Sequence, residues 1–552
     1  MRVRSHAALW LLPLVLFVPA LVVDQGALFG STDALYYTLL MKLSGRQFLM
    51  GDFWPRWLLD ADAGLGAPLM YAYPPLPYLL TAGFTCPLWL IHVGLGGRML
   101  AGMYLATVAS GYSALYWLRT YFPPQTALAA ALLYMLLPYR LVYIYLHFNL
   151  AQLWALAWLP LWMTACDRIL TGRRQGVWAF AICAALVTYS HPLTVLAFGA
   201  VPVAYLGWLG RARWRRTAGQ LAAALLLSSG LIASYAVSFT EMKQWMIGSG
   251  LAGSTFNGGR YSVFNNLSHV DSVFVAPYVA IAVVILLLSR RQVDIPLAGR
   301  FWIVTICVLW GLTFQVSAPF WRLVRPLQSL QFPVARLHAG MLVGVAFLAG
   351  AYLALRPFPK ATPDYLRPAA FWLLVVMGTF PVLFRIATVY SSAAHRDLTA
   401  DYVATMHQHA IVGPEWYHLL WSDMDGPAVY RQRARIDMMP QAHFMSGNGE
   451  LTVQRWHPGH ISLSANVRSS GAAIAVKQRY IPAWAGLDRS ESHPVAIVPS
   501  GIEGLLSFTL QQGTHEVDLR LERGDMLRAA DWLSLITLGA AVICLSRTHR
   551  SS

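Results

Sequence analysis

The stretch Ser31–Leu80, STDALYYTLLMKLSGRQFLMGDFWPRWLLDADAGLGAPLMYAYPPLPYLL, decides how the rest of the chain is arranged. It lies between two apolar segments, and it is too polar to span a membrane yet too apolar to stand free in water. Apolar residues recur at roughly helical spacing over Tyr36–Phe48 and again over Phe53–Leu58, which predicts two short helices lying along the membrane surface. Three prolines between Tyr73 and Tyr78 then stiffen the return into the bilayer.

The composition around this stretch is that of a polytopic membrane protein. Hydrophobic residues make up 57% of the chain, charged residues 12%, and the mean hydropathy is +0.49. The formal charge of +16 does not indicate nucleic-acid binding, because the arginines cluster in short loops between apolar segments, where they orient helices. The five cysteines all lie in apolar segments without metal-ligand spacing, which favours core positions.

The apolar segments predict about 12 to 14 transmembrane helices. An uncleaved signal anchor at the N-terminus is followed by twelve further segments, at 76–93, 99–118, 126–137, 150–168, 177–190, 192–209, 217–240, 273–289, 300–316, 337–355, 370–386 and 530–546. The arginine distribution places both termini in the cytoplasm. Thirteen spans cannot satisfy that placement, so either one segment between 76 and 150 is re-entrant or one more exists. The segments in question are 126–137 and the aromatic stretch 138–149.

Three regions follow from this pattern. Residues 1–386 form a transmembrane domain whose first outside loop is 24–75, residues 387–528 form an outer mainly-β domain, and residues 529–552 form a final helix and cytoplasmic tail. Six stretches with strand-like alternation predict a small antiparallel sandwich: 450–456, 460–467, 472–480, 494–500, 504–510 and 515–521.

Four motifs, together with Asp33, carry a resemblance to a known family. They are GDFWPRW at 51–57, GLGAPLMYAYPPLPY at 64–78, SLQFPVARLH at 329–338 and QRYIPAWAGLD at 478–488. As a set they resemble the bacterial membrane proteins labelled 6-pyruvoyl-tetrahydropterin-synthase-related, a label that implies no pterin chemistry here. Those proteins are similar in plan to YfhO-like proteins and to the C-type (GT-C) glycosyltransferase superfamily.

The resemblance implies an inner-membrane enzyme with its β domain on the outer face. Such an enzyme transfers a sugar, with inversion, from a polyprenyl-phosphate-linked donor to a glycan or lipid-linked acceptor. Asp33 matches the acidic residue that works at the acceptor hydroxyl, Glu241 resembles a glutamate at the start of the second outside loop, and Arg336 resembles the arginine of a QFP-containing stretch. The resemblance leaves open whether a divalent cation, Mg²⁺ or Mn²⁺, binds at Asp33.

Independently of any resemblance, glycosyl transfer requires two kinds of chemical group. A base must lie near the acceptor, and positive charge must lie near the departing phosphate, because charge develops at both places in the transition state. Candidates for the base are Asp33, helped by Asp52 or Glu241; candidates for the phosphate are Arg336, Arg322, Arg325 and Arg56. The structural alternatives are that Asp33 and Asp52 cap the helices that follow them, and that Asp60 and Asp62 are solvated.

Three further residues are candidates for lining the substrate: Tyr73, His191 and Arg140. The alternatives are an interfacial aromatic belt for the tyrosine and a satisfied buried histidine at a proline turn for His191. Two other functional classes also stay open. A transporter normally carries ionisable residues at mid-membrane, which the spans 177–209 and 273–289 offer almost only in His191. A non-catalytic membrane protein that binds a glycan or lipid is not excluded by a shared fold.

Overall fold

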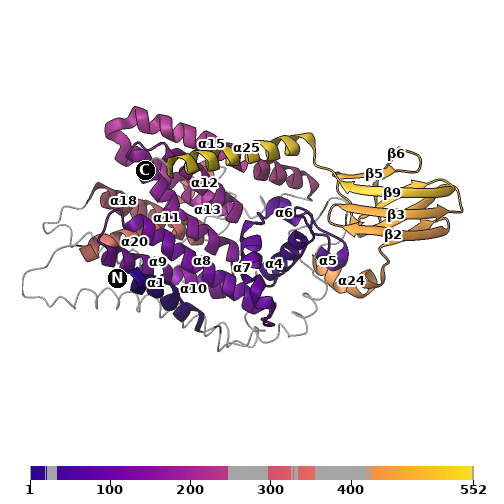
Figure 1. Ribbon diagram of the computed structural model, residues 1–552, viewed down its shortest axis with the longest axis horizontal. Helices are drawn as coiled ribbons and strands as arrows, with labels where there is room; N and C mark the ends of the chain where they lie inside the picture. The colour runs from indigo at the N-terminus through magenta and orange to yellow at the C-terminus, as the bar shows by residue number, and fades with distance from the viewer. Residues whose placement is uncertain are drawn as a thin grey trace, which may run out of the picture.

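The computed structural model of this chain describes residues 2–18, 20, 34–246, 296–324, 327, 333–354, 419, 422 and 426–549. A body of packed helices forms one end of the molecule and two β-sheets form the other (Figure 1). The predicted division into an apolar helical region and a C-terminal β domain is confirmed.

The predicted apolar segments that fall on described residues are helical over most of their length. The predicted spans 273–289 and 370–386 lie outside the described residues. The principal helices are α1 (Arg2–Leu11), α7 (Leu76–Trp89), α8 (Leu95–Leu118), α9 (Pro124–Leu136), α11 (Leu150–Leu170), α12 (Gln175–Ser190), α13 (Pro192–Phe198), α14 (Ala200–Leu209), α15 (Trp214–Trp245), α18 (Leu297–Gly311), α20 (Pro333–Ala354) and α25 (Asp525–His549).

Among the described residues, four helical stretches are long and apolar enough to cross a membrane: Pro124–Tyr145, Pro192–Trp245, Arg336–Ala354 and Asp525–Ser546. Helix α11 packs against α8 and α12 and is buried almost all round, as expected for a helix that is apolar on every face. Helix α25 packs against α15 and, less extensively, against α12 on one side. Its other side exposes large apolar residues such as Trp532 and Ile536, which suits contact with lipid.

The aromatic stretch at 138–149 adds no separate span to the thirteen predicted from the sequence. Helix α9 ends where Leu137 turns to an extended conformation, and α10 (Pro138–Leu141) and the π-helical turn η2 (Val142–Leu146) continue the chain. The residue before a proline disfavours helical geometry, so Pro138 bends the run. The two questioned segments therefore form one bent apolar stretch rather than two.

The first of the two predicted short helices is present as α4 (Ala34–Leu49), and its position along the membrane surface stays a prediction. The second, at Phe53–Leu58, is wrong, because residues 50–60 form turns and bends. Pro55 interrupts the helical pattern, and Leu58 instead exchanges backbone hydrogen bonds with Ala67 at 2.8 and 3.1 Å. Two four-residue helices follow, α5 (Ala61–Gly64) and α6 (Leu69–Ala72).

The β domain is an antiparallel sandwich. One sheet has the strand order β1-β4-β8-β7 and the other β2-β3-β9-β5-β6. All six predicted strands are present, with 494–500 divided into two. The strands are β1 (Ala442–Ser446), β2 (Gly449–His457), β3 (His460–Val467), β4 (Ala472–Arg479), β5 (Trp484–Asp488), β6 (His493–Val495), β7 (Val498–Ser500), β8 (Leu505–Leu510) and β9 (Gly513–Leu521), and helix α24 (Gly426–Met438) precedes them.

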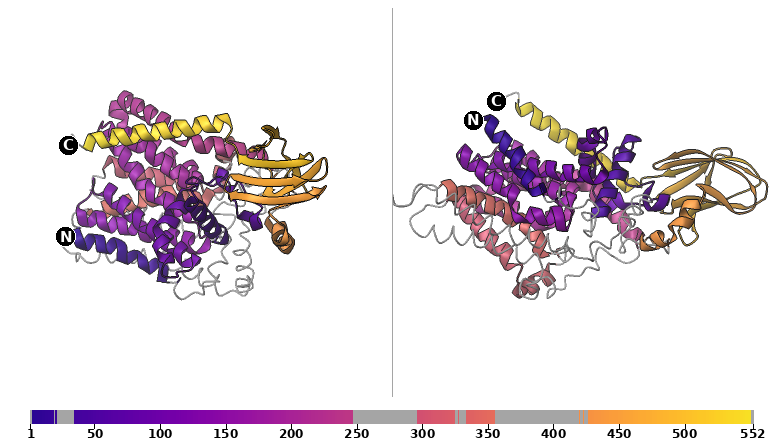
Figure 2. Two further views of the ribbon diagram at one scale, coloured as in Figure 1. Left: turned by 45° about the vertical axis from the view of Figure 1, so that its right-hand side comes forward. Right: turned by 90° about the horizontal axis from the view of Figure 1, so that it is seen from below.

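Helix α25 leads from the sheets back along the helical body. Both chain ends lie at the end of this body that is farthest from the sheets (Figures 1 and 2). If the helices cross a membrane along this direction, the β domain and the two termini lie on opposite sides of it, as the topology prediction requires. Which side is the cytoplasm stays a prediction.

Candidate functional site

The start of α4 lies in a cluster of tyrosines. Asp33 precedes this helix directly and lies outside the described residues. One turn further on, Tyr36 packs edge-on against Tyr73 with ring centroids 5.1 Å apart, and Tyr37 stacks on Tyr78. The Tyr73 ring, a candidate for lining the substrate, therefore lies beside the first turn of the helix that Asp33 introduces.

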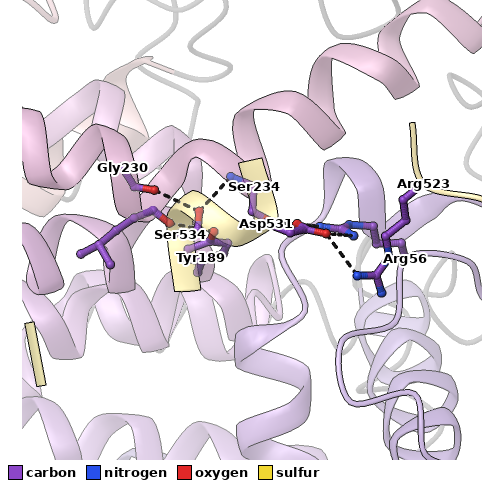
Figure 3. A network of polar contacts seen from close by, with 8 residues as sticks. Arg56, Tyr189, Gly230, Ser234, Arg523, Asp531 and Ser534 are labelled. Carbon is purple, nitrogen blue, oxygen red and sulfur yellow. Dashed lines mark hydrogen bonds and ion pairs between the residues drawn. The ribbon is translucent and has the colours of Figure 1, made fainter. Parts of the chain in front are cut away.

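Arg56 lies in a network that joins the first loop to two long helices (Figure 3). Its guanidinium donates two hydrogen bonds to the Asp531 carboxylate, at 2.6 and 3.1 Å, and a third to the Ser234 hydroxyl at 2.8 Å. Ser234 in turn donates to Asp531 at 2.7 Å, and Arg523 reaches the same carboxylate at 3.2 Å. A phosphate at Arg56 would have to compete with this carboxylate.

Glu241 lies near the same network, beside Gly524 and partly exposed. The network borders a cavity of about 490 Å³ at the start of α25, lined by Glu522, Arg523, Arg528, Asp531, Trp532 and Leu535. Two of the sequence candidates, Arg56 and Glu241, are thus brought to one region, where charged groups meet the apolar surface of α25.

Asp52 is held by the end of α4. Gln47 donates a hydrogen bond to its carboxylate at 2.9 Å. Burial raises the pKa of Asp52, and the hydrogen bond from Gln47 offsets part of this effect. A carboxyl group with a raised pKa accepts a proton more readily near neutral pH. The alternative of a helix cap at Asp52 is wrong, because no helix begins at Phe53.

A second polar group lies among the long helices. Arg336, buried on α20, donates to the Gln152 side-chain oxygen at 2.8 Å and to the Tyr143 hydroxyl at 3.4 Å, with its guanidinium 5.9 Å from the Tyr143 ring centre. His338, two residues further along α20, stacks on Tyr139 at 5.2 Å. Arg336 is thus embedded among aromatic and amide groups contributed by three segments of the chain.

The other arginine and histidine candidates have different surroundings. Arg140 is fully buried, donates to the Tyr134 carbonyl at 3.0 Å and lies 4.9 Å over the Tyr134 ring. His191 is buried at the break between α12 and α13 and pairs with Thr194 at 2.9 Å, as the structural alternative expected. Arg325 and the side chain of Arg322, on α19 (Ala318–Leu323), lie outside the described residues.

The prediction that Asp62 is solvated is wrong. Its carboxylate is fully buried and forms an ion pair of 2.6 Å with Arg479 of the β domain. Asp60 is partly exposed and pairs with Arg46 at 2.8 Å. Because a buried carboxylate needs a paired charge or hydrogen bonds, Asp62 is a structural anchor rather than a solvated charge.

Sequence reasoning did not single out Gln152 or Asp531. Gln152 is a polar residue inside an otherwise apolar run, and that isolation was a usable signal, since polar groups at such positions usually have a specific partner. Asp531 lies at the start of the last apolar segment, close to other charged residues, and gave a weaker signal. Gln47 and Ser234 offered no comparable signal, because amides and hydroxyls are common on helices.

Metal-binding side chains gather at one place among the described residues. Ligand atoms of Asp488, Glu491 and His515 lie within 4.8 Å of one another. The His515 ring contacts the Asp488 carboxylate at 2.6 Å and the Gln511 carbonyl at 3.0 Å through its two nitrogens. Those contacts already satisfy the ring, so Asp488 and His515 form a buried pair within the sandwich, while Glu491 is exposed.

Fold and site together define a largely helical protein with several apolar helices and a C-terminal β-sheet domain. No protein-family model matches the chain, and no curated protein matches it. Among solved structures, the chain is similar to ArnT from Cupriavidus metallidurans bound to undecaprenyl phosphate, with 13% identity, a TM-score of 0.39, and coverage of 90% of this chain and 97% of that one. It is also similar to the same protein in the apo state, with 17% identity, a TM-score of 0.33 and 76% of each chain covered.

Proposed function

We propose that this chain is a membrane-embedded glycosyltransferase of the GT-C type, which uses a polyprenyl-phosphate-linked sugar. The observation that carries the proposal is Arg336, a buried arginine on an apolar helix of membrane-spanning length. Arg336 is the first residue of that stretch, and a buried charge at such a position requires polar partners and is a candidate for a functional site. A guanidinium also matches the geometry of a phosphate, to which it can donate two parallel hydrogen bonds.

In the proposed reaction the acceptor hydroxyl oxygen attacks the anomeric carbon of the donor sugar from the face opposite the phosphate. The bond between that carbon and the phosphate oxygen breaks, and polyprenyl phosphate leaves with the electron pair. Arg336 stabilises the charge that develops on the departing phosphate. The acceptor proton passes to a carboxylate, with Asp33 as the first candidate and Asp52 or Glu241 as the others.

The site would receive its donor from the membrane and its acceptor, a glycan or a lipid-linked molecule, at the membrane surface. Tyr36 and Tyr73, which are only partly buried, would line the sugar beside the start of α4. The β domain would face the outside of the inner membrane. The proposed mechanism does not require a divalent cation at Asp33, although it is compatible with one.

The test measures donor binding and turnover in the purified protein. Arg336→Lys keeps the charge but loses the planar fork, so apparent donor affinity should fall while thermal unfolding in detergent changes little. Arg168→Lys is the matched control, since Arg168 also lies on an apolar helix but contacts Tyr116 at the surface. Unchanged donor affinity in Arg336→Ala would remove this residue from the site. Donor binding without turnover would instead favour a non-catalytic lipid-binding protein.

A further inference from the structure

The segment 57–67 of the first loop docks on strand β4 of the sheet domain. The Trp57 indole donates to the Gln478 side-chain oxygen at 2.7 Å, and the Gln478 amide nitrogen donates to the carbonyls of Leu59 and Gly64 at 3.1 and 2.7 Å. The next residue, Arg479, donates its backbone N–H to the Leu65 carbonyl at 2.6 Å. Two adjacent residues of one strand therefore bind the segment at four points, and Figure 1 shows α5 directly beside the sheets.

An ion pair and an unusual backbone conformation lie at the centre of this contact. Asp62 and Arg479 are both buried, and their charged atoms are 2.6 Å apart. Asp62 and the following Ala63 have φ angles of 54° and 60°, a left-handed conformation that non-glycine residues rarely adopt. Such a conformation persists only where the surroundings enforce it, and it is often found next to functional sites.

The docked segment is also bound on its other side, by α4. Gln47 accepts a hydrogen bond from the Leu59 N–H at 2.9 Å and donates to the Trp57 carbonyl at 2.6 Å. The same Gln47 amide nitrogen donates to Asp52 at 2.9 Å. Leu59 therefore connects Gln478 of the sheet domain directly to Gln47, and Gln47 holds a candidate carboxylate.

We propose that Gln478 and Arg479 are positioning residues, through which the sheet domain fixes the segment 57–67 and, by way of Gln47, the place of Asp52. The sheet domain then belongs to the reaction site, although neither residue touches the reacting atoms. The part of this inference that concerns turnover rests on the proposed transferase function. The docking itself does not depend on it.

The first experiment measures hydrogen exchange of the full-length protein in detergent. Gln478→Glu keeps the shape and the acceptor for Trp57 but replaces the donor with an oxygen that faces two carbonyls. Arg479→Gln leaves Asp62 buried without its ion-pair partner. In both variants, exchange within 57–67 should rise by about tenfold or more, while β3 and β9 keep their protection. The matched control is Arg468→Gln, which breaks the exposed ion pair to Glu450 in the same domain and should leave 57–67 unchanged.

The second experiment separates positioning from general loss of stability. Because a small displacement of a reacting group can lower a rate by about a hundredfold, kcat should fall about tenfold to a hundredfold in both variants, with the donor KM within about twofold of the wild type. The double variant Asp62→Asn with Arg479→Gln leaves no buried unpaired charge, so its kcat should recover relative to Arg479→Gln alone.

Unchanged exchange within 57–67 in both variants would overturn the docking. Faster exchange with a wild-type kcat would overturn the positioning role. If the wild-type protein itself transfers no sugar from a polyprenyl-phosphate donor, the transferase proposal fails, and the exchange measurement still decides whether strand β4 holds the loop.

Discussion

The Arg56–Asp531 pair makes a quantitative prediction for Asp531→Ala. The side chains are 6% and 15% exposed, so the substitution leaves a guanidinium nearly buried without its carboxylate. Removing one partner of a buried pair costs about 3 to 5 kcal/mol. We use the lower end of this range for two reasons. The wild-type pair is already in partial contact with water, and in the variant the Ser234 hydroxyl still accepts a hydrogen bond from Arg56. The pair to Arg523, which is 53% exposed, adds at most about 1 kcal/mol. We therefore expect a loss of about 3 to 4 kcal/mol.

The measurement is denaturant unfolding in mixed detergent micelles, with the free energy of unfolding extrapolated to zero denaturant. The control is Asp525→Ala on the same helix, since Asp525 is 95% exposed and pairs with an exposed arginine. The free energy of unfolding of this control should fall by at most about 1 kcal/mol, because only an exposed ion pair and a favourable contact with the helix dipole are lost. Asp531→Asn keeps an acceptor for Arg56 and should fall between the two. If Asp531→Ala and Asp525→Ala lowered the free energy of unfolding equally, burial would not determine how much the Arg56–Asp531 pair contributes to stability.

Three further predictions concern the base, the sheet domain and the topology. Asp33→Asn keeps a good helix cap and should lower the transfer rate by roughly a hundredfold without moving the melting temperature; wild-type turnover would show that Asp33 is only a cap. Burial alone raises the pKa of Asp518, but hydrogen bonds from Arg489 and His460 outweigh it and hold the pKa below its ordinary value. The resulting stabilisation is therefore present above about pH 4 and is lost as the pH falls through the lowered pKa, and an acid titration of Asp518→Asn should lack this step. A reporter active only outside the cytoplasm should be active after Gly447 and silent after Ser552, and the reverse pattern would invert the topology.

The helices and most strands could be predicted because their signals are local. An apolar run such as 150–168 specifies a buried helix by length alone, and alternation in 460–467 specifies a strand with one buried face. The two strands that were not predicted lack that pattern. Ala442–Ser446 has no fully buried residue, and Trp484–Asp488 is short and contains a glycine. The false helix at Phe53–Leu58 had the right spacing but contained Pro55.

The candidate site was predictable residue by residue but not as a geometry. The QFP-containing stretch identified Arg336 as a candidate, yet nothing near it in the chain indicated Gln152 as its partner. The sequence predicts Asp62 as a solvated charge, whereas the structure buries it. Its partner Arg479 is 417 positions away, and no local pattern reports a contact at that separation.

Those separations have a consequence for biosynthesis. Asp62 and Arg56 leave the ribosome 417 and 475 residues before the residues that neutralise them. At about 5 to 20 residues per second, the first loop waits on the order of 20 to 80 seconds for Arg479. During that time Asp62 lacks its ion-pair partner, and the final helix must insert before Arg56 can pair with Asp531. A chain interrupted anywhere before strand β4 therefore leaves Asp62 and Arg56 without their oppositely charged partners, however many of its helices have already reached the membrane.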